Sequence, residues 1–285
     1  MPLDQVNVDE WDDTTPGSTP EKEMSFFDHI DELRGHIIRS VFVLFIAFIG
    51  VFLMKDFVFN YLLFGPVKAD FITFRLLCGF SESTCFDPPN VTTFIVTGMS
   101  EAFITHMSIS FWISLAIVFP YFIWEAWRFV SPGLLAKERS AAGNVVAVSG
   151  LLFFIGVLFG YFVVAPLAIV FLANYGLPMT QGFYKISDYI DLLVMMTIPL
   201  GIVFELPVVI FFLTKMGILT PSFLREYRRY AVVILMIIAA IVTPSPDAAS
   251  MLLVFSPLYG LYEISILVSA REYKRLSAKG LTLDQ

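Results

Sequence analysis

The long apolar stretches of this chain constrain its fold more than any other feature. From Leu192 to Leu213, 22 successive residues are apolar or small apart from Thr197 and Glu205. A helix needs about 20 such residues to cross the hydrocarbon core of a bilayer. The chain is 57% hydrophobic and only 15% charged, whereas soluble domains are about 25% charged. We therefore predict an all-α integral membrane protein.

Six apolar segments are predicted to be transmembrane helices. In chain order they are approximately residues 37–59, 103–127, 145–172, 192–213, 231–242 and 251–268. The last two are short, with 12 and 18 residues, so the final hairpin should thin the bilayer or stay shallow on one side. Before the first segment, apolar residues at helical spacing predict an amphipathic helix that lies on the inner surface and leads into the membrane.

Lysine and arginine residues are distributed unequally between the two sides of the membrane. With the N-terminus in the cytoplasm, 14 bases fall inside and four outside, which is the bias typical of membrane proteins and places both termini inside. Residues 1–23 carry seven acids and one base, a composition typical of disorder. The predicted organisation is a disordered acidic leader at 1–24, a six-helix membrane domain at 25–270 and a cytoplasmic tail at 271–285.

Glu205 is an acid placed inside the fourth apolar segment. Placing a carboxyl group at membrane depth costs free energy, so Glu205 should face a protein interior, a partner or a wet cavity rather than lipid. Two residues later, Pro207 has no N–H, so the carbonyl of Val203 loses its helical partner and the helix should bend. We favour a functional role for Glu205, and a protonated Glu hydrogen-bonded inside the helix bundle remains the alternative.

Two further acids, Glu32 and Glu138, are predicted at the inner membrane face. A carboxylate accepts hydrogen bonds from a guanidinium in bidentate geometry, so two such groups would suit a ligand with adjacent arginines. From spacing alone, the favoured interpretation is internal pairing with Arg34, Lys137 or Arg139.

The remaining motifs exclude several classes of protein. No phosphate-binding loop, zinc-protease motif or serine-hydrolase motif is present, so we expect no enzyme activity, cofactor or metal. Cys78 and Cys85 lie in the first outer loop, where a disulfide and two free thiols are both compatible with the sequence. The Gly156–Gly160 spacing predicts close helix packing, within the chain rather than between copies.

Five short motifs together resemble one family, TatC, the large subunit of the twin-arginine protein translocase. They are HIDELR at 29–34, FVSP at 129–132 followed by KER at 137–139, FELP at 204–207, TPSPD at 243–247 and PLYGLYE at 257–263. Their order and membrane sidedness match, and the resemblance covers about residues 26–270. It implies a concave, glove-like arrangement of six helices in the bacterial inner membrane. It also implies an oligomeric complex with the single-span subunits TatA and TatB, which exports folded proteins using the proton-motive force.

The resemblance also implies roles for particular residues. It assigns Glu32, Glu138 and Phe129, with Leu33 and Arg34, to the site for twin-arginine signal peptides, and this outweighs the internal pairing favoured above. It assigns Glu205, Pro207 and Glu263 to contacts with partner helices, and Pro66 and Asp247 to functional outer loops. This chain has Glu125 where a glutamine is common in the family, and we predict that this extra acid enlarges the arginine-binding patch.

Two other functions were weighed against the translocase. An ion-coupled small-molecule transporter could use Glu205 as its proton carrier, but such folds usually contain internal repeats, and the sequence shows no convincing one. An intramembrane enzyme would need a nucleophile and a base that the sequence does not supply.

Overall fold

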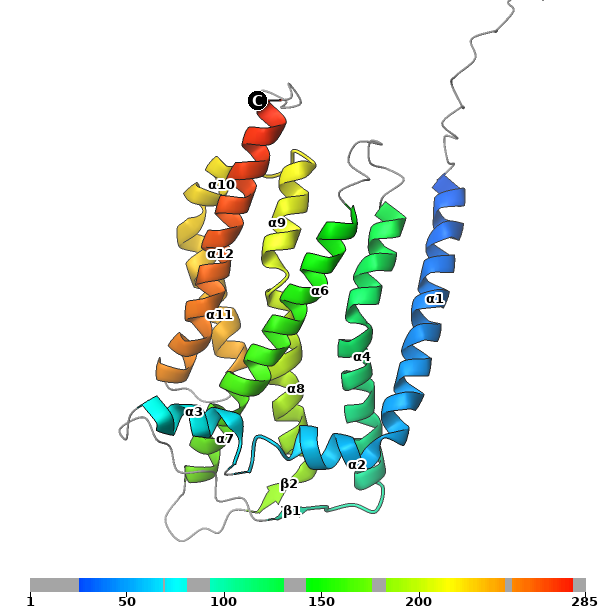
Figure 1. Ribbon diagram of the computed structural model, residues 1–285, viewed down its shortest axis with the longest axis vertical. Helices are drawn as coiled ribbons and strands as arrows, with labels where there is room; N and C mark the ends of the chain where they lie inside the picture. The colour runs from blue at the N-terminus through cyan, green and yellow to red at the C-terminus, as the bar shows by residue number, and fades with distance from the viewer. Residues whose placement is uncertain are drawn as a thin grey trace, which may run out of the picture.

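The computed structural model describes residues 26–68, 70–80, 93–130, 142–175, 183–243 and 248–278, and these residues are almost entirely helical (Figure 1). Within them, five helical stretches are long and apolar enough to cross a membrane. They are Asp31–Leu53, Glu101–Phe129, Val146–Asn174, Ile186–Lys215 and Ser250–Ser277. The chain is a multi-pass membrane protein, and the predicted all-α class is confirmed.

The bundle has two distinguishable ends. Helix α1 (Phe26–Leu53) begins and α12 (Ala248–Ser277) ends at the end drawn uppermost in Figure 1, which we call the terminal end. Strands β1 (Phe94–Ile95) and β2 (Tyr184–Lys185) lie at the opposite end, which we call the strand end.

Helix α1 is one unbroken helix, so the separate surface helix predicted before the first span is not found. The apolar residues Phe26, Ile30 and Leu33 share the helical period of the span that follows, and the helix has no reason to break between them. It packs along α4 (Glu101–Val130). Most of its remaining apolar surface is exposed, as expected for side chains that face lipid.

The third span changes its helical geometry part-way. It consists of α6 (Ala142–Phe159), a π-helical turn η4 (Gly160–Val164) and α7 (Ala165–Asn174). Pro166 lies in the first turn of α7 and has no N–H to give to the carbonyl four residues earlier, that of Phe162. Instead, the hydroxyl of Thr73 donates a hydrogen bond to this carbonyl. The proline therefore leaves no unpaired backbone acceptor at this depth.

Gly156 and Gly160 of the third span lie against α8 (Ile186–Val203). A Cβ atom on Gly156 would come within 2.8 Å of the Cα atom of Gly201, and one on Gly160 would overlap the carbonyl oxygen of Met196. The predicted packing within the chain is therefore confirmed. In lipid, such close backbone contact is a main source of helix association.

The fourth span is interrupted where the sequence predicted a bend. Helix α8 ends at Val203, and α9 (Leu206–Lys215) begins after Phe204 and Glu205. Pro207 lies in the first turn of α9, where its missing N–H is tolerated. Pro199, in contrast, lies inside α8 without ending it.

The prediction that both helices of the last hairpin are short is wrong for the second helix. After α10 (Pro221–Glu226), α11 (Arg228–Val242) has 15 residues, whereas α12 has 30. Helix α12 is long because it continues through the polar residues that follow its apolar stretch, which an apolar run alone does not reveal. Helix α11 is shorter than the five candidate spans.

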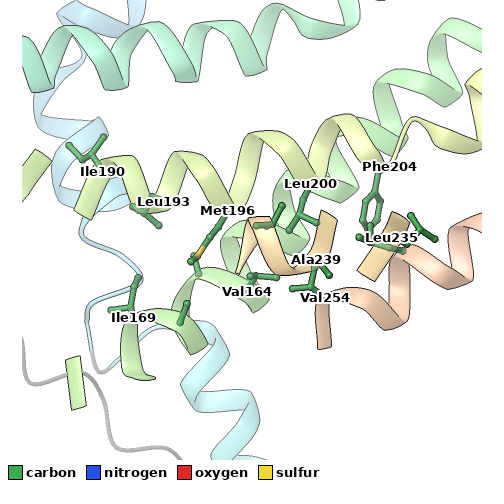
Figure 2. Packing of buried hydrophobic residues seen from close by; sticks show 14 of the residues in the cluster. Val164, Ile169, Ile190, Leu193, Met196, Leu200, Phe204, Leu235, Ala239 and Val254 are labelled. Carbon is green, nitrogen blue, oxygen red and sulfur yellow. The ribbon is translucent and has the colours of Figure 1, made fainter. Parts of the chain in front are cut away.

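The buried core is centred on α8, as Figure 2 shows. Met196 and Leu200 are fully buried. Around them lie Val164 of η4, Ala239 of α11 and Val254 of α12. Since lipid tails are as apolar as these side chains, their contribution to stability is close van der Waals packing rather than removal from water.

At the strand end, the third and fourth spans hold the segment that follows α1. This segment comprises α2 (Lys55–Phe57), the π-helical turn η1 (Val58–Leu63) and α3 (Ile72–Phe80). The hydroxyl of Tyr161 donates to the carbonyl of Leu62 at 2.5 Å, and that of Tyr189 donates to the carbonyl of Leu63 at 2.6 Å. Two backbone acceptors at the end of η1 are thus paired.

The starts of α4 and α8 are joined at the same end. β1 and β2 pair in parallel, with Phe94 opposite Tyr184. Glu101, the first residue of α4, lies 3.5 Å from Lys185 Nζ and accepts a hydrogen bond of 3.0 Å from Ser187.

Candidate functional site

Glu32 lies near the start of α1, at the terminal end. Its Oε2 atom is buried and has no hydrogen-bond partner among the described residues. No ion pair joins it to Arg34 within that part of the chain, so the internal pairing with Arg34 considered from the sequence is not found. Leu33 and Arg34 are exposed beside it. The structure therefore shows a carboxylate oxygen that is shielded from solvent and has no donor within the described chain.

Phe129 lies near the end of α4 and is half-buried. Its ring contacts the ring of His36 edge to face, with centroids 6.1 Å apart. Because Glu32 and His36 are four residues apart in one helix, they lie on the same face of α1. Glu138, the other predicted acid of this site, lies outside the described residues, so its approach to Glu32 stays a prediction.

Glu125 lies on α4, one turn before Phe129, and is only 2% exposed. It forms an ion pair and hydrogen bond with His36 Nδ1. Its other oxygen accepts a hydrogen bond of 2.7 Å from Tyr121 and lies 3.9 Å from Arg39 and 4.0 Å from Arg128. The extra acid is therefore surrounded by donors from its own chain.

No sequence pattern singles out His36. Its partner Glu125 is 89 residues away in the sequence, and no local pattern joins them. The available signal was its position, one helical turn after Glu32 on the face of α1 that turns toward α4.

A second polar site lies at the break between α8 and α9. Glu205 is 7% exposed, and its Oε2 accepts a hydrogen bond of 2.6 Å from Ser149 of α6. Its Oε1 is buried without a partner in the described chain, as is Trp127 Nε1 of α4. Both residues line a cavity of about 310 Å³ whose other walls are mostly apolar. As predicted for an acid at this depth, Glu205 faces protein and a cavity, beside the buried Pro207.

Glu263 of α12 is bonded to two neighbouring side chains. It lies 2.9 Å from Arg228 Nη2 at the start of α11 and accepts a hydrogen bond of 2.7 Å from Tyr259. These contacts tie the last two helices together, and a partner helix that binds Glu263 must compete with them.

The remaining predicted residues lie at the strand end or beyond the described ranges. Pro66 is fully buried in the turn after η1. Cys78 lies in α3 and is disulfide-bonded. Its predicted partner Cys85 and the outer-loop Asp247 lie outside the described residues, so the Cys78–Cys85 pairing and the role of Asp247 stay predictions.

Comparison with known proteins identifies the family. The family described as Sec-independent protein translocase protein (TatC) has a sequence model that matches residues 28–257. A TatC protein of Blattabacterium sp. subsp. Periplaneta americana is 36% identical over 259 residues, which cover 87% of this chain and 96% of that protein. The chain belongs to the TatC family.

Other TatC proteins support this assignment over nearly their whole length. TatCy of Bacillus subtilis is 32% identical over 254 residues, covering 89% of this chain and 91% of that protein. A crystal structure of the twin-arginine translocase receptor TatC in DDM is similar with a TM-score of 0.67 at 30% identity, covering 85% of this chain and 99% of that chain. The matched range contains every predicted TatC site residue except Glu263.

The TatC assignment decides between the functions weighed from the sequence. The chain is a subunit of the Sec-independent protein translocase, a non-enzymatic protein transport system. The predicted resemblance is thereby confirmed, and the small-molecule transporter is disfavoured.

Proposed function

We propose that this TatC chain is the receptor that binds the paired arginines of twin-arginine signal peptides. The observation that carries the proposal is the buried Oε2 atom of Glu32 at the terminal end of α1, which has no partner among the described residues. A guanidinium that reaches this oxygen forms a charge-assisted hydrogen bond, and such bonds are about twice as strong as neutral ones. Phe129, on the adjacent end of α4, supplies an apolar surface against the arginine stem. Glu138 supplies the second acceptor.

We further propose that the terminal end is cytoplasmic and that the membrane is the bacterial inner membrane. The excess of lysine and arginine in the segments at that end supports this orientation. Helix α11 then forms a sixth span and completes the glove-like arrangement. At 15 residues it is about 22 Å long, shorter than a hydrocarbon core of about 30 Å. The bilayer thins around it.

In this proposal, single-span subunits of the TatA and TatB type bind along the fourth and last spans. The Oε1 atom of Glu205, which has no partner in the described part of the chain, gives a polar contact point inside the membrane, with Pro207 beside it. Glu263 offers a second contact if it leaves Arg228. The apolar part of the signal peptide moves from the arginine site toward Glu205, and the proton-motive force drives export of the folded cargo.

The test is the affinity of the purified protein for a fluorescent twin-arginine signal peptide, measured by anisotropy. Glu32→Gln removes the charge but keeps the shape of the side chain. A hydrogen bond to a charged group contributes about 2 kcal/mol, so we expect roughly 30-fold weaker binding. Asp31→Asn is the matched control, since Asp31 is an exposed acid in the same turn. Its affinity should change less than about twofold, as for an exposed charge.

Changing the peptide gives a second test of the same site. Replacing its two arginines by alanines should weaken binding to the native protein and change binding to Glu32→Gln much less. Native affinity in a folded Glu32→Gln protein would overturn the proposed receptor site.

A further inference from the structure

The contact between α1 and α4 differs along its length. In its middle, an outward-open groove of about 560 Å³ is lined by exposed apolar residues of both helices, among them Phe45 and Met107. Toward the strand end, Phe52 stacks on His106 with ring centroids 4.1 Å apart. At the terminal end, the buried His36 pairs with Glu125. Both ends of the interface therefore add specific side-chain contacts to its apolar packing.

The surroundings of Glu125 show what this carboxylate can do. His36 occupies one oxygen, and Tyr121, Arg39 and Arg128 surround the other. Arg128 is itself held over the ring of Trp124, 4.8 Å from its centroid. A carboxylate has about four acceptor positions, and here the chain's own donors face them. Glu32 differs, because one of its oxygens has no partner in the described chain.

We propose that His36 and Glu125 are a positioning pair that fixes the start of α1 against α4, so that Glu32 is held beside Phe129. Glu125 does not itself bind the arginines of the ligand, contrary to the role predicted for it from sequence. His36 makes the link directly, since its ring contacts Phe129 and its Nδ1 atom bonds Glu125. The inference deepens the proposed receptor function and rests on it.

Loss of one partner of the His36–Glu125 pair should cost more than loss of both partners. Without His36, Glu125 loses the donor to one oxygen and keeps Tyr121 at the other, and without Glu125, His36 loses the partner of its Nδ1 atom. Removing one member of a buried pair is destabilising, whereas replacing both by apolar residues is often neutral. Loss of either partner should therefore free the start of α1, and replacement of both should fix it again. This rescue is not expected of a carboxylate that binds the ligand directly.

The experiment compares His36→Phe, Glu125→Leu and the double variant in the signal-peptide anisotropy assay. His36→Phe keeps an aromatic ring against Phe129 but cannot donate to Glu125. We expect each single variant to bind about tenfold more weakly, within the range of coupling between residues in contact. The double variant should bind more tightly than either single variant. His36→Gln, which retains an N–H donor, should stay within about threefold of the native affinity.

A direct role of Glu125 gives a different pattern. His36→Phe would then bind normally, and the loss in Glu125→Leu would persist unchanged in the double variant. That pattern overturns the proposal.

A structural measurement keeps this test separate from the receptor test. Spin labels at Ile38 of α1 and Ala126 of α4, both exposed, report the distance between the two helices without any peptide. The distance distribution should broaden in both single variants and narrow again in the double variant. An unchanged distribution in both single variants overturns the positioning role, whatever the peptide affinities. Native affinity in Glu32→Gln overturns the receptor site alone and leaves the distance result standing.

Discussion

Ser149 of α6 donates a hydrogen bond of 2.6 Å to Glu205 Oε2, across the interface between the third and fourth spans. In Ser149→Ala, both oxygens of Glu205 would lack a partner in the described chain, since Oε1 already has none. We expect the free energy of unfolding to fall by about 1–2 kcal/mol, the range for a buried bond to a carboxyl group within a membrane bundle. Thermal unfolding of the detergent-purified protein measures this loss.

Ser110→Ala is the matched control for that substitution. Ser110 is also fully buried, but its hydroxyl bonds the carbonyl of His106 in its own helix. That carbonyl keeps its helical partner when the hydroxyl is removed, so the loss should be below about 0.5 kcal/mol. Equal losses of unfolding free energy in the two variants would show that the hydrogen bond from Ser149 to Glu205 does not stabilise the protein.

Gly160→Ala should be among the most destabilising single-methyl changes in the protein. The new Cβ atom would overlap the carbonyl oxygen of Met196 and lie 2.9 Å from Thr197 Cα. Both are backbone atoms, so the helices must separate. Overpacking of this kind costs about 1–3 kcal/mol. Thermal stability and the yield of monodisperse protein provide the measurement.

Gly260→Ala tests whether that loss comes from the close contact rather than from the substitution itself. Gly260 lies inside α12, and a Cβ atom there would meet nothing within 4 Å. Since alanine favours a helix by up to about 1 kcal/mol over glycine, this variant should be as stable as the native protein or more so. The prediction fails if both alanine variants lose stability equally.

Tyr189→Phe should loosen the turn that follows η1. The lost hydroxyl leaves the carbonyl of Leu63 without its donor from α8, at a cost of about 1 kcal/mol. Backbone amides in residues 64–68, which contain the buried Pro66, should exchange with deuterium faster, as mass spectrometry can measure. Tyr175→Phe is the control, since Tyr175 is 68% exposed. Unchanged exchange in Tyr189→Phe would show that other contacts hold this turn.

Five of the six predicted spans match helices that are long and apolar enough to cross a membrane, because a bilayer demands long apolar helices. The break at Glu205 followed from Pro207. The packing of Gly156 and Gly160 was also predictable from the sequence, since small residues at this spacing let membrane helices approach closely. Helix ends were less predictable. Helix α1 starts before its apolar stretch and α12 ends after it, because helical hydrogen bonding continues through polar residues once a helix leaves the membrane core.

The side-chain pairs of the candidate site were beyond sequence reasoning. Glu125 stands out in the sequence as an unusual acid, but its partner His36 lies 89 residues earlier and no periodicity links them. Trp127 was not predicted to share a cavity with Glu205 for the same reason. Such pairs are set by how α1, α4 and α6 dock, which depends on packing between segments rather than on any one of them.

The parallel pairing of β1 with β2 limits how the bundle can move. It joins the residues before α4 to those before α8, and Glu101 adds bonds to Lys185 and Ser187 at the same level. Sliding one of these helices along the other would break the backbone ladder and both side-chain contacts together. A rearrangement that starts at the opposite end, where we propose that the signal peptide binds, would therefore pivot about this joined point, with the largest displacement farthest from it.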